Sequence, residues 1–221
     1  MESSNLPRPT QADYEKLLKL EKNDKWTDEY LDWLNRFDWS TALFKEKGKY
    51  GLKTALGEVL LPVAFEDFMM LTSQMLKKGD LVVTQQNGLW GVIIADGMGT
   101  WQVEPSYDYV GYPNTLTHVC RDGKWGVLNV KTGKFLIPLE CDMVYAHSGF
   151  MFMNGVGSYE KDGKTGIIRE DGSFTEAIFE DVVIDPEDLV RVKLNGQWGF
   201  IKEDGTFTTD EDDEVWVPYD D

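Results

Sequence analysis

The feature that most constrains the fold is a five-residue pattern that occurs five times along the chain. Each copy has Gly at its second and fifth positions and an aromatic residue or Thr at its fourth. The copies span Lys47–Gly51, Asn87–Gly91, Asp122–Gly126, Asp162–Gly166 and Asn195–Gly199. Their closing glycines are 40, 35, 40 and 33 residues apart, a period typical of repeat architectures. We therefore expect most of the 221 residues to form one small structural unit that recurs.

Each copy has the sequence of a β-hairpin. Asn-Gly or Asp-Gly after an extended run supplies the positive φ angles of a two-residue turn, and the aromatic residue then starts the returning strand, as in Trp125–Val130. The glycine after the aromatic residue is expected to allow a neighbouring strand or ring to pack closely. Six or seven residues later comes a second turn glycine, namely Gly57, Gly97, Gly133, Gly172 or Gly205.

A third strand is expected after the second turn, often ending at a proline, as in Val59–Pro62 and Phe135–Pro138. An acid-bearing segment then leads to the next copy. The aspartates of these segments are Asp67, Asp108, Asp142 and Asp181. Because they recur once per copy, we expect them to serve a turn or a cap rather than one asymmetric site.

The sequence predicts a mainly β fold, a tandem array of five three-stranded meanders over residues 46–209. One such meander buries too little apolar surface to be stable alone, so neighbouring copies must stack. The array is expected to be an open twisted solenoid, with a closed, small propeller-like ring as the alternative. A helical segment favours the open form, because a closed ring has no end that needs a cap.

Residues 1–45 are predicted to form that short helical cap and to cover an open sheet edge. Thr10 can cap a helix from Gln11 to about Lys22, with Asp13 placed to close a capping box. Thr27 can cap a second helix, whose apolar residues recur with the helical period. These residues are Tyr30, Trp33, Leu34 and Phe37. The alternative is a helix pair that binds a partner.

The five units resemble WG repeats, also called KWG repeats, which combine Asp/Asn-Gly-Lys-Trp-Gly, a turn glycine and a strand ending in Ile-Pro. Asp122–Pro138 matches this pattern nearly residue for residue, and Asn87–Pro105 and Asn195–Phe207 match it well. Tyr50 and Thr165 replace the tryptophan in the first and fourth units. The resemblance implies a bacterial-type protein with a binding or scaffolding role. It supplies no catalytic residue, because the family's defining residues are structural.

The charge of the chain limits its partners. The formal net charge is −17, which repels phosphate and makes nucleic acid or an anionic membrane an unfavourable ligand. Residues 170–221 hold 17 acids against three basic residues, and residues 210–221 are predicted to be an acidic C-terminal tail. Met1–Asn5 has no basic or apolar character, so no secretory signal is expected. With two cysteines, a cytoplasmic, reducing location fits best.

The sequence contains no recognisable catalytic or cofactor motif, so we expect no enzyme, no cofactor and no metal site. The two histidines and two cysteines are His118, His147, Cys120 and Cys141. Their spacing matches no zinc pattern, and we expect packed strand residues instead. The glycine-rich stretches lack the residues of a dinucleotide or phosphate-binding loop.

The sequence therefore favours a protein-binding module, most specifically a bacterial immunity protein. It would block the active site of a basic toxin or effector domain through its acidic surface. The candidate contact residues are Asp185, Glu187, Asp188, Asp210, Glu211, Asp212, Asp213, Glu214, Trp216 and Tyr219. A generic WG-repeat scaffold with a merely solubilising tail is the alternative, and a hydrolase that uses carboxylates alone is a third hypothesis.

Overall fold

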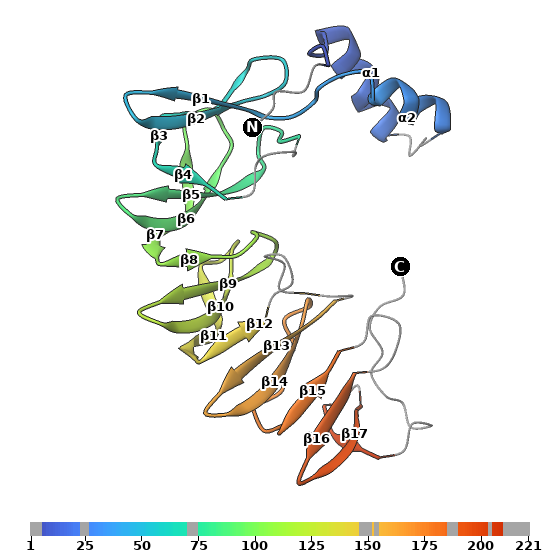
Figure 1. Cartoon of the computed structure of the whole chain (residues 1–221), viewed down its shortest axis with the longest axis vertical. Coiled ribbons are helices and arrows are strands. Elements are labelled where there is room, and N and C mark those ends of the chain that lie inside the picture. Colours follow the sequence, from blue (N-terminus) through green and yellow to red (C-terminus); the bar gives the residue numbers. More distant parts are fainter. Residues whose placement is uncertain are drawn as a thin grey trace. The chain divides into compact units, whose positions relative to one another are not determined.

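The computed structural model confirms a mainly β chain with two short helices and several small antiparallel sheets (Figure 1). The structure describes residues 6–22, 27–69, 75–145, 152, 155–184, 190–202 and 205–209. The chain divides into two compact parts. The first part comprises residues 1–87 and 93–101, and the second comprises residues 88–92 and 102–221.

The predicted helix over residues 11–22 is confirmed as α1 (Gln11–Lys22). The backbone N–H of Thr10 donates to the Asp13 carboxylate at 2.9 Å, and the N–H of Asp13 reaches the Thr10 hydroxyl at 3.3 Å. This is the reciprocal capping box that the sequence predicts. The second helix, α2 (Asp28–Leu34), is also confirmed. It ends in tighter turns, where the N–H of Phe37 bonds to the carbonyl of Leu34 at 3.3 Å.

The helices pack around an aromatic cluster that lies just before the first strand. Trp33, Phe37 and Trp39 meet edge to face, with ring centroids 5.7 to 5.9 Å apart. The Trp39 indole N–H donates to the carbonyl of Leu34 at 2.9 Å. Leu17 of α1 is buried in the same cluster, which Met75 also joins. The two helices are therefore held together by this aromatic and apolar cluster. Their role as a cap on an open sheet edge stays a prediction.

Within the described residues, five small sheets follow the helices, and strand β1 begins the first of them. Sheet 1 has the order β1-β2-β3 and sheet 2 the order β4-β5-β6-β7. Their strands are β1 (Ala42–Glu46), β2 (Lys49–Lys53), β3 (Val59–Phe65), β4 (Asp67–Phe68), β5 (Leu81–Gln86), β6 (Leu89–Ile94) and β7 (Thr100–Tyr107).

Sheets 3, 4 and 5 all lie in the second part of the chain. Sheet 3 has the order β11-β10-β9-β8, sheet 4 β12-β13-β14, and sheet 5 β15-β16-β17-β18. Their strands are β8 (Tyr109–Val110), β9 (Leu116–Arg121), β10 (Lys124–Asn129), β11 (Lys134–Cys141), β12 (Met143–Tyr145), β13 (Val156–Lys161), β14 (Lys164–Arg169), β15 (Asp181–Val183), β16 (Arg191–Leu194), β17 (Gln197–Ile201) and β18 (Phe207–Thr208).

The five predicted two-residue turns are confirmed by their backbone angles. The first turn residue has a φ between 47° and 55° in every copy, and the glycine after it has a φ between 70° and 84°. Two successive positive φ angles define the hairpin turn that matches strand twist. The first turn residues are Lys47, Asn87, Asp122, Asp162 and Asn195.

The glycine after the aromatic residue lies where the third strand crosses closely. At Gly126, a Cβ atom would lie 2.8 Å from the carbonyl oxygen of Ile137. At Gly51, it would lie 2.8 Å from the carbonyl oxygen of Leu61. Both distances are shorter than a real Cβ contact, so the predicted close packing is confirmed.

The register shifts at the same place, because the third strand bulges opposite this glycine. Trp125 pairs with Cys141, and Val127 pairs with Ile137. These two pairs are four residues apart on β11 but only two residues apart on β10. The proline lies inside this bulge. The expectation that the third strand ends at proline is therefore wrong for β3, β7 and β11, which continue to Phe65, Tyr107 and Cys141. A bulge leaves positions without a ladder hydrogen bond, which is where proline is tolerated.

The third strands β3, β7 and β11 pass directly into the following sheet. After Cys141 and one linking residue, the chain forms β12, which pairs with β13 of sheet 4. The strands β4 and β8 follow β3 and β7 in the same way, and β15 begins two residues after the bridge residue Phe179. The link between copies is thus a short edge strand and not an irregular loop.

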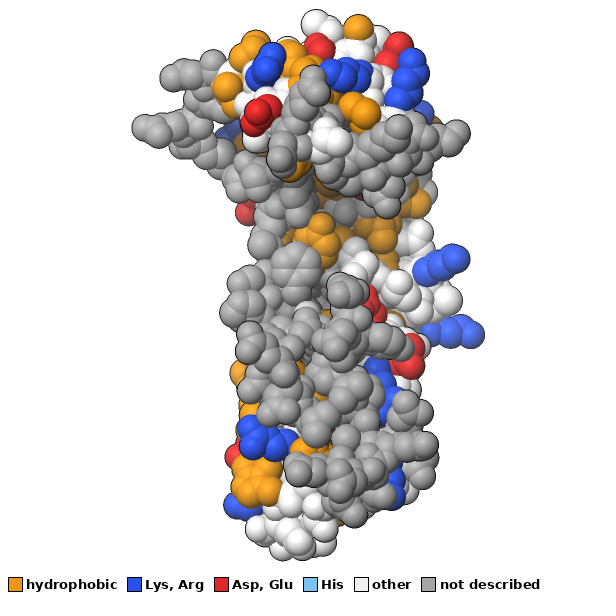
Figure 2. Space-filling view, turned by 90° about the vertical axis from the view of Figure 1, so that its right-hand side faces the viewer, with side chains coloured by type: hydrophobic (Ala, Val, Ile, Leu, Met, Phe, Trp, Pro, Cys, Tyr) orange, Lys and Arg blue, Asp and Glu red, His pale blue; other side chains and the backbone are white. Residues whose placement is uncertain are grey.

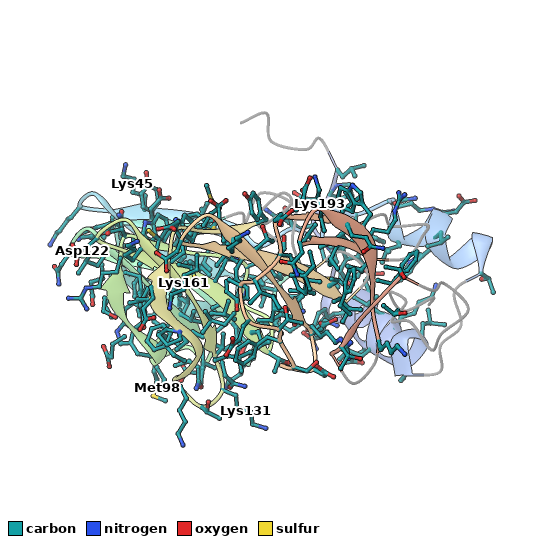
Figure 3. All side chains as sticks on the ribbon, turned by 90° about the horizontal axis from the view of Figure 1, so that it is seen from below. Lys45, Met98, Asp122, Lys131, Lys161 and Lys193 are labelled. Atoms are coloured by element: carbon teal, nitrogen blue, oxygen red, sulfur yellow. The ribbon has the colours of Figure 1, made fainter. Side chains whose placement is uncertain are left out.

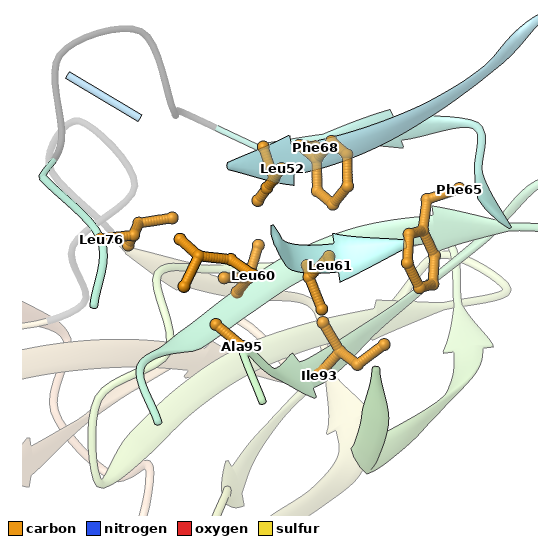
Figure 4. Close-up of a cluster of buried hydrophobic side chains, with 9 residues drawn as sticks. Leu52, Leu60, Leu61, Phe65, Phe68, Leu76, Ile93 and Ala95 are labelled. Carbon is orange, nitrogen blue, oxygen red and sulfur yellow. The ribbon is translucent and has the colours of Figure 1, made fainter. Parts of the chain in front are cut away.

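Both faces of the middle sheets are buried. Ile168 of β14 packs with Val127, Ile137 and Tyr159 between sheets 3 and 4. Its neighbour Ile167 faces the other side, in a cluster shared with sheet 5. In the first part, a cluster around Leu52, Leu61 and Ile93 is buried in the same way (Figure 4). Burial on two faces explains the unbroken apolar runs of the returning strands.

Sheet 4 lacks a regular third strand among the described residues. Two isolated bridges, Ile168 to Phe174 and Thr165 to Phe179, take the place of a ladder. This is the copy in which Thr165 replaces tryptophan.

We expect Gly126→Ala to destabilise the protein by about 3 kcal/mol, because the new methyl group forces the backbone of β11 outward. Gly133→Ala is the matched control. A Cβ at Gly133 meets no atom within 4 Å at a φ of 67°, so it pays only the left-handed backbone cost of about 1 kcal/mol. Urea unfolding of both variants measures the difference. Equal losses would contradict the importance of the close approach.

Candidate functional site

The contact residues predicted from the acidic sequence lie outside the described residues. This holds for Asp185, Glu187 and Asp188, and for the tail residues Asp210–Glu214, Trp216 and Tyr219. Their role therefore stays a prediction. The described residues supply three other features of interest: a row of carboxylates, a groove and a buried histidine.

Carboxylates in three of the links between sheets hold the turn of the next sheet. The Asp108 carboxylate accepts the backbone N–H of Asp122 at 2.7 Å, and Asp142 accepts that of Asp162 at 2.9 Å. Glu180 accepts the N–H of Gly196 at 3.0 Å. The predicted turn role is confirmed for Asp108 and Asp142.

In the last link, a neighbouring residue takes the predicted role. Glu180, not Asp181, reaches the turn of the following sheet, whereas the Asp181 carboxylate accepts the N–H of Val182 at 2.9 Å. Asp67 likewise accepts the N–H of Phe68 at 2.8 Å. Both aspartates thus cap the start of their own edge strand, and a Glu can extend further to the next turn.

A lysine from the hairpin completes the arrangement at Asp142. The ammonium of Lys124 lies 2.6 Å from the Asp142 carboxylate. This hydrogen bond lowers the pKa of Asp142 and raises the pKa of Lys124. The N–H of Asp162 lowers the pKa of Asp142 further. Asp142 therefore remains ionised and joins the hairpin of sheet 3 to the turn of sheet 4.

A groove runs between β11 and the segment that replaces a third strand in sheet 4. It consists of two adjoining hollows with volumes of about 370 Å³ and about 270 Å³, and Leu136 lines both. The larger hollow is lined by Leu136, Ile137, Pro138, Glu140, Cys141, Tyr159, Lys161, Asp162, Lys164, Phe174, Glu176 and Ala177. The smaller one is lined by Thr115, Leu116, Asn129, Lys134, Phe135, Leu136, Glu170, Asp171 and Gly172.

The floor of the groove is neutral at physiological pH. Burial raises the pKa of the Cys141 thiol to about 11 and that of the Tyr159 hydroxyl to about 12. The Tyr159 hydroxyl donates to the carbonyl of Thr175 at 2.7 Å. A protonated thiol is a poor nucleophile, and this tyrosine holds its proton in a structural hydrogen bond. The floor thus offers apolar contact and no activated group.

Two phenylalanines lie exposed along the groove. Phe135 is 40% exposed and Phe174 is 49% exposed, although most large apolar side chains of these sheets are buried. On the face shown in Figure 2, hydrophobic side chains are likewise exposed directly beside Lys and Arg side chains. Exposed aromatic residues next to a hollow are typical of protein interfaces.

His118 is buried in sheet 3, between Tyr109 and Trp125. Its ring stacks on Trp125 with centroids 5.8 Å apart, and only 2% of the residue is exposed. Within the described chain, its Nδ1 atom has no hydrogen-bond partner. Desolvation lowers the pKa of His118 to about 4. The neutral imidazole therefore serves as a packed strand residue, as the sequence predicts.

Both cysteines are free thiols in the same sheet. Trp125 pairs with Cys120 on one side and with Cys141 on the other, so one full strand separates the two sulfur-bearing residues. Burial raises the pKa of Cys120 as well. Among the described residues, no three His, Cys, Asp or Glu side chains gather as a metal site. His147 lies outside the described residues.

Sequence reasoning missed the groove. Phe135 and Phe174 each stand two residues after a turn glycine, as does Phe207, and this recurrence was the available signal. It could not reveal the groove, because the hollow forms only where two sheets meet and one third strand is irregular.

Comparison with known proteins gives no family for this chain. No protein-family model matches the sequence, and no curated protein matches it. A solved structure described as Kluyveromyces lactis Hsv2 is similar over 77% of this chain and 59% of that chain, with 11% identity and a TM-score of 0.35. A likeness at this level carries no argument about function. Neither α1 nor α2, the helices in the described part of the chain, has the length and apolar character of a membrane span.

We expect Asp142→Ala to lower the thermal midpoint of unfolding and Asp142→Asn to lower it less. Asparagine keeps an acceptor for the N–H of Asp162 but loses the charge that pairs with Lys124. Asp122→Asn is the control that removes a carboxylate from the same region, and asparagine already occupies this turn position at Asn87 and Asn195. Thermal unfolding followed by circular dichroism tests the order. A fall in the thermal midpoint from Asp122→Asn as large as that from Asp142→Ala would contradict this order.

His118 is expected to make stability depend on pH. Its folded pKa of about 4 lies below the unfolded value of about 6.5, so the unfolded chain binds the proton first as the pH falls. Stability is then full above pH 6.5 and declines toward pH 4, by up to about 3 kcal/mol. Urea unfolding between pH 7.5 and 4.5 measures this decline. His118→Phe keeps a flat ring without a titrating group and should flatten the profile; an unchanged profile assigns the decline to other groups.

Proposed function

We propose that the chain is a non-catalytic protein-binding module built from five WG-like three-stranded units in an open array. The five turns with matching angles support the unit, and the passage of β3, β7 and β11 into the next sheet supports a tandem order. In this proposal, residues 1–45 cap the array, residues 46–209 form it, and residues 210–221 are an acidic tail.

The observation that carries the proposal is the groove between β11 and residues 172–177. It combines exposed Phe174 at a hollow of about 370 Å³ with exposed Phe135 at a hollow of about 270 Å³, and hollows of this size accept side chains of a partner. Its buried Cys141 and Tyr159 are held neutral. These features favour apolar and hydrogen-bonded recognition over acid–base or nucleophilic chemistry.

The specific form that we propose is a bacterial immunity protein in the cytoplasm, which occludes the active site of a basic toxin or effector domain. The distribution of charge supports this form, because 17 acids against three basic residues occupy positions 170–221. Such a surface accelerates association with a basic protein. In this form, the contacts come from Asp185, Glu187, Asp188 and residues 210–214, with Trp216 and Tyr219 as aromatic anchors.

The alternative is a generic scaffold whose partner docks on the sheets, while the tail only keeps the protein soluble. The groove favours this alternative, since the described residues that line it come from sheets 3 and 4 and from the segments beside their strands.

Deletion of residues 210–221 separates the two forms. The full chain and the truncated chain are immobilised and exposed to a lysate of the native cells, then washed at 50 and at 500 mM salt. The immunity form predicts one stoichiometric basic partner that the full chain releases at high salt. The truncated chain should bind this partner at least tenfold more weakly, because several charge pairs are lost.

A full-length variant with the acids of 210–214 changed to Asn and Gln is the matched control for chain length. The same loss of affinity in this variant assigns the effect to charge. Unchanged affinity and salt dependence in both variants contradict the immunity form and favour the scaffold.

A further inference from the structure

We infer that the groove between sheets 3 and 4 binds a basic segment of a partner protein, in which an arginine or lysine stands next to an aliphatic or aromatic residue. This inference rests on the proposed protein-binding function. It adds the position of the interface and the chemistry of the segment that occupies it.

The apolar part of the groove requires an apolar contribution from the partner. Leu136, Ile137, Phe174 and Ala177 line the larger hollow together with the neutral Cys141 thiol. Its volume of about 370 Å³ exceeds that of one side chain, so a short peptide segment fits better than a single group. Phe174 at 49% exposure gains the most from being covered, because burial of apolar surface is the main favourable contribution at interfaces.

The charged rim selects a cationic segment. Among the residues that the structure describes, five carboxylates and three lysines line the two hollows. Lys161 and Glu140 form an ion pair with each other and so cancel. The remaining lining charges are Asp162, Glu170, Asp171 and Glu176 against Lys134 and Lys164, an excess of two negative charges.

Two of the lining carboxylates, those of Asp162 and Glu176, are available for a partner. Within the described residues, neither Asp162 nor Glu176 has a side-chain ion pair, while the Asp171 carboxylate accepts the N–H of Ser173 at 2.7 Å and a side-chain hydrogen bond from Ser173. A purely apolar segment would cover these groups without pairing them, which costs free energy. An arginine avoids this cost, because its stem packs on apolar surface while its head pairs with a carboxylate. Its planar head can also lie over an aromatic face such as that of Phe174.

The rim lies close to the ends of the hairpins. Lys161 ends β13 directly before the turn of sheet 4, and Figure 3 shows it on the same side as Asp122 of the sheet 3 turn, away from Lys131. A partner segment in the groove would therefore run beside the turns that Asp142 holds in place. These turns are fixed before binding, so little ordering is needed there.

The test uses the full chain and a nine-residue peptide of alternating arginine and leucine as the probe. A second peptide replaces every arginine by glutamate. Binding is measured by calorimetry at 50 mM salt, and the site is located by amide chemical shifts. We expect the arginine peptide to bind and to shift the resonances of Leu136, Phe174 and Glu176, and the glutamate peptide not to bind.

Two pairs of variants locate the effect. Glu176→Lys should weaken peptide binding about threefold to tenfold, through loss of a pair and new repulsion. Glu104→Lys, at an exposed residue of β7 outside the groove, should change peptide binding only through the altered net charge of the protein. Phe174→Ser should weaken binding about tenfold, whereas Trp198→Ser, at another exposed aromatic residue, should not.

Three results overturn the inference: no binding of the arginine peptide, shifts confined to residues 210–221, or equal effects of each variant and its control. Shifts confined to the tail leave the proposed protein-binding function intact and move its interface. A native partner that binds the full chain equally well after Glu176→Lys and Phe174→Ser would likewise place the interface outside the groove and leave the protein-binding function intact. Failure of the proposed function itself would instead appear as no native partner for the full chain.

Discussion

The passage of the third strand over a residue without a side chain is the constraint on which the connection between sheets depends. At Gly126 the carbonyl of Ile137 occupies the space of a Cβ atom, and the strand bulges there over four residues. Beyond the bulge the strand pairs once more with its own sheet, at Cys141 and Trp125, and the chain then passes through Asp142 into the next sheet as the edge strand β12. A proline is tolerated in the bulge because the bulge makes no demand on its missing N–H.

The carboxylates convert this connection into a fixed register. Asp108 and Asp142 follow the third strands β7 and β11, and Glu180 follows the bridged segment of sheet 4; each accepts a backbone N–H from the next two-residue turn. A residue placed by one sheet therefore positions the turn of the following sheet. Individually these are exposed interactions of modest strength, but they act at the same point as a buried apolar cluster, such as that of Ile137, Tyr159 and Ile168. Packing supplies the stability, and the carboxylates supply the alignment.

The groove arises where this regular scheme is relaxed. In sheet 4 the third strand is reduced to two bridges, and the surface beside β11 is left open between Leu136 and Phe174. The proposed binding function thus belongs to the irregular copy, while the regular copies provide a rigid support. A rigid support with a locally open surface is a common way to place binding residues without weakening a fold.

Local sequence determined the turns, the helix caps and the mainly β character. Asn-Gly and Asp-Gly specify positive φ angles, and Thr10 with Asp13 specifies a helix start, through interactions among residues that are neighbours in the chain. Only the tertiary structure decided where the third strands end, that Glu180 rather than Asp181 reaches the next turn, and that Phe135 and Phe174 border a groove. These features depend on contacts between separate strands and sheets. Residue spacing encodes the local period of the chain but not the distance between surfaces that meet after folding.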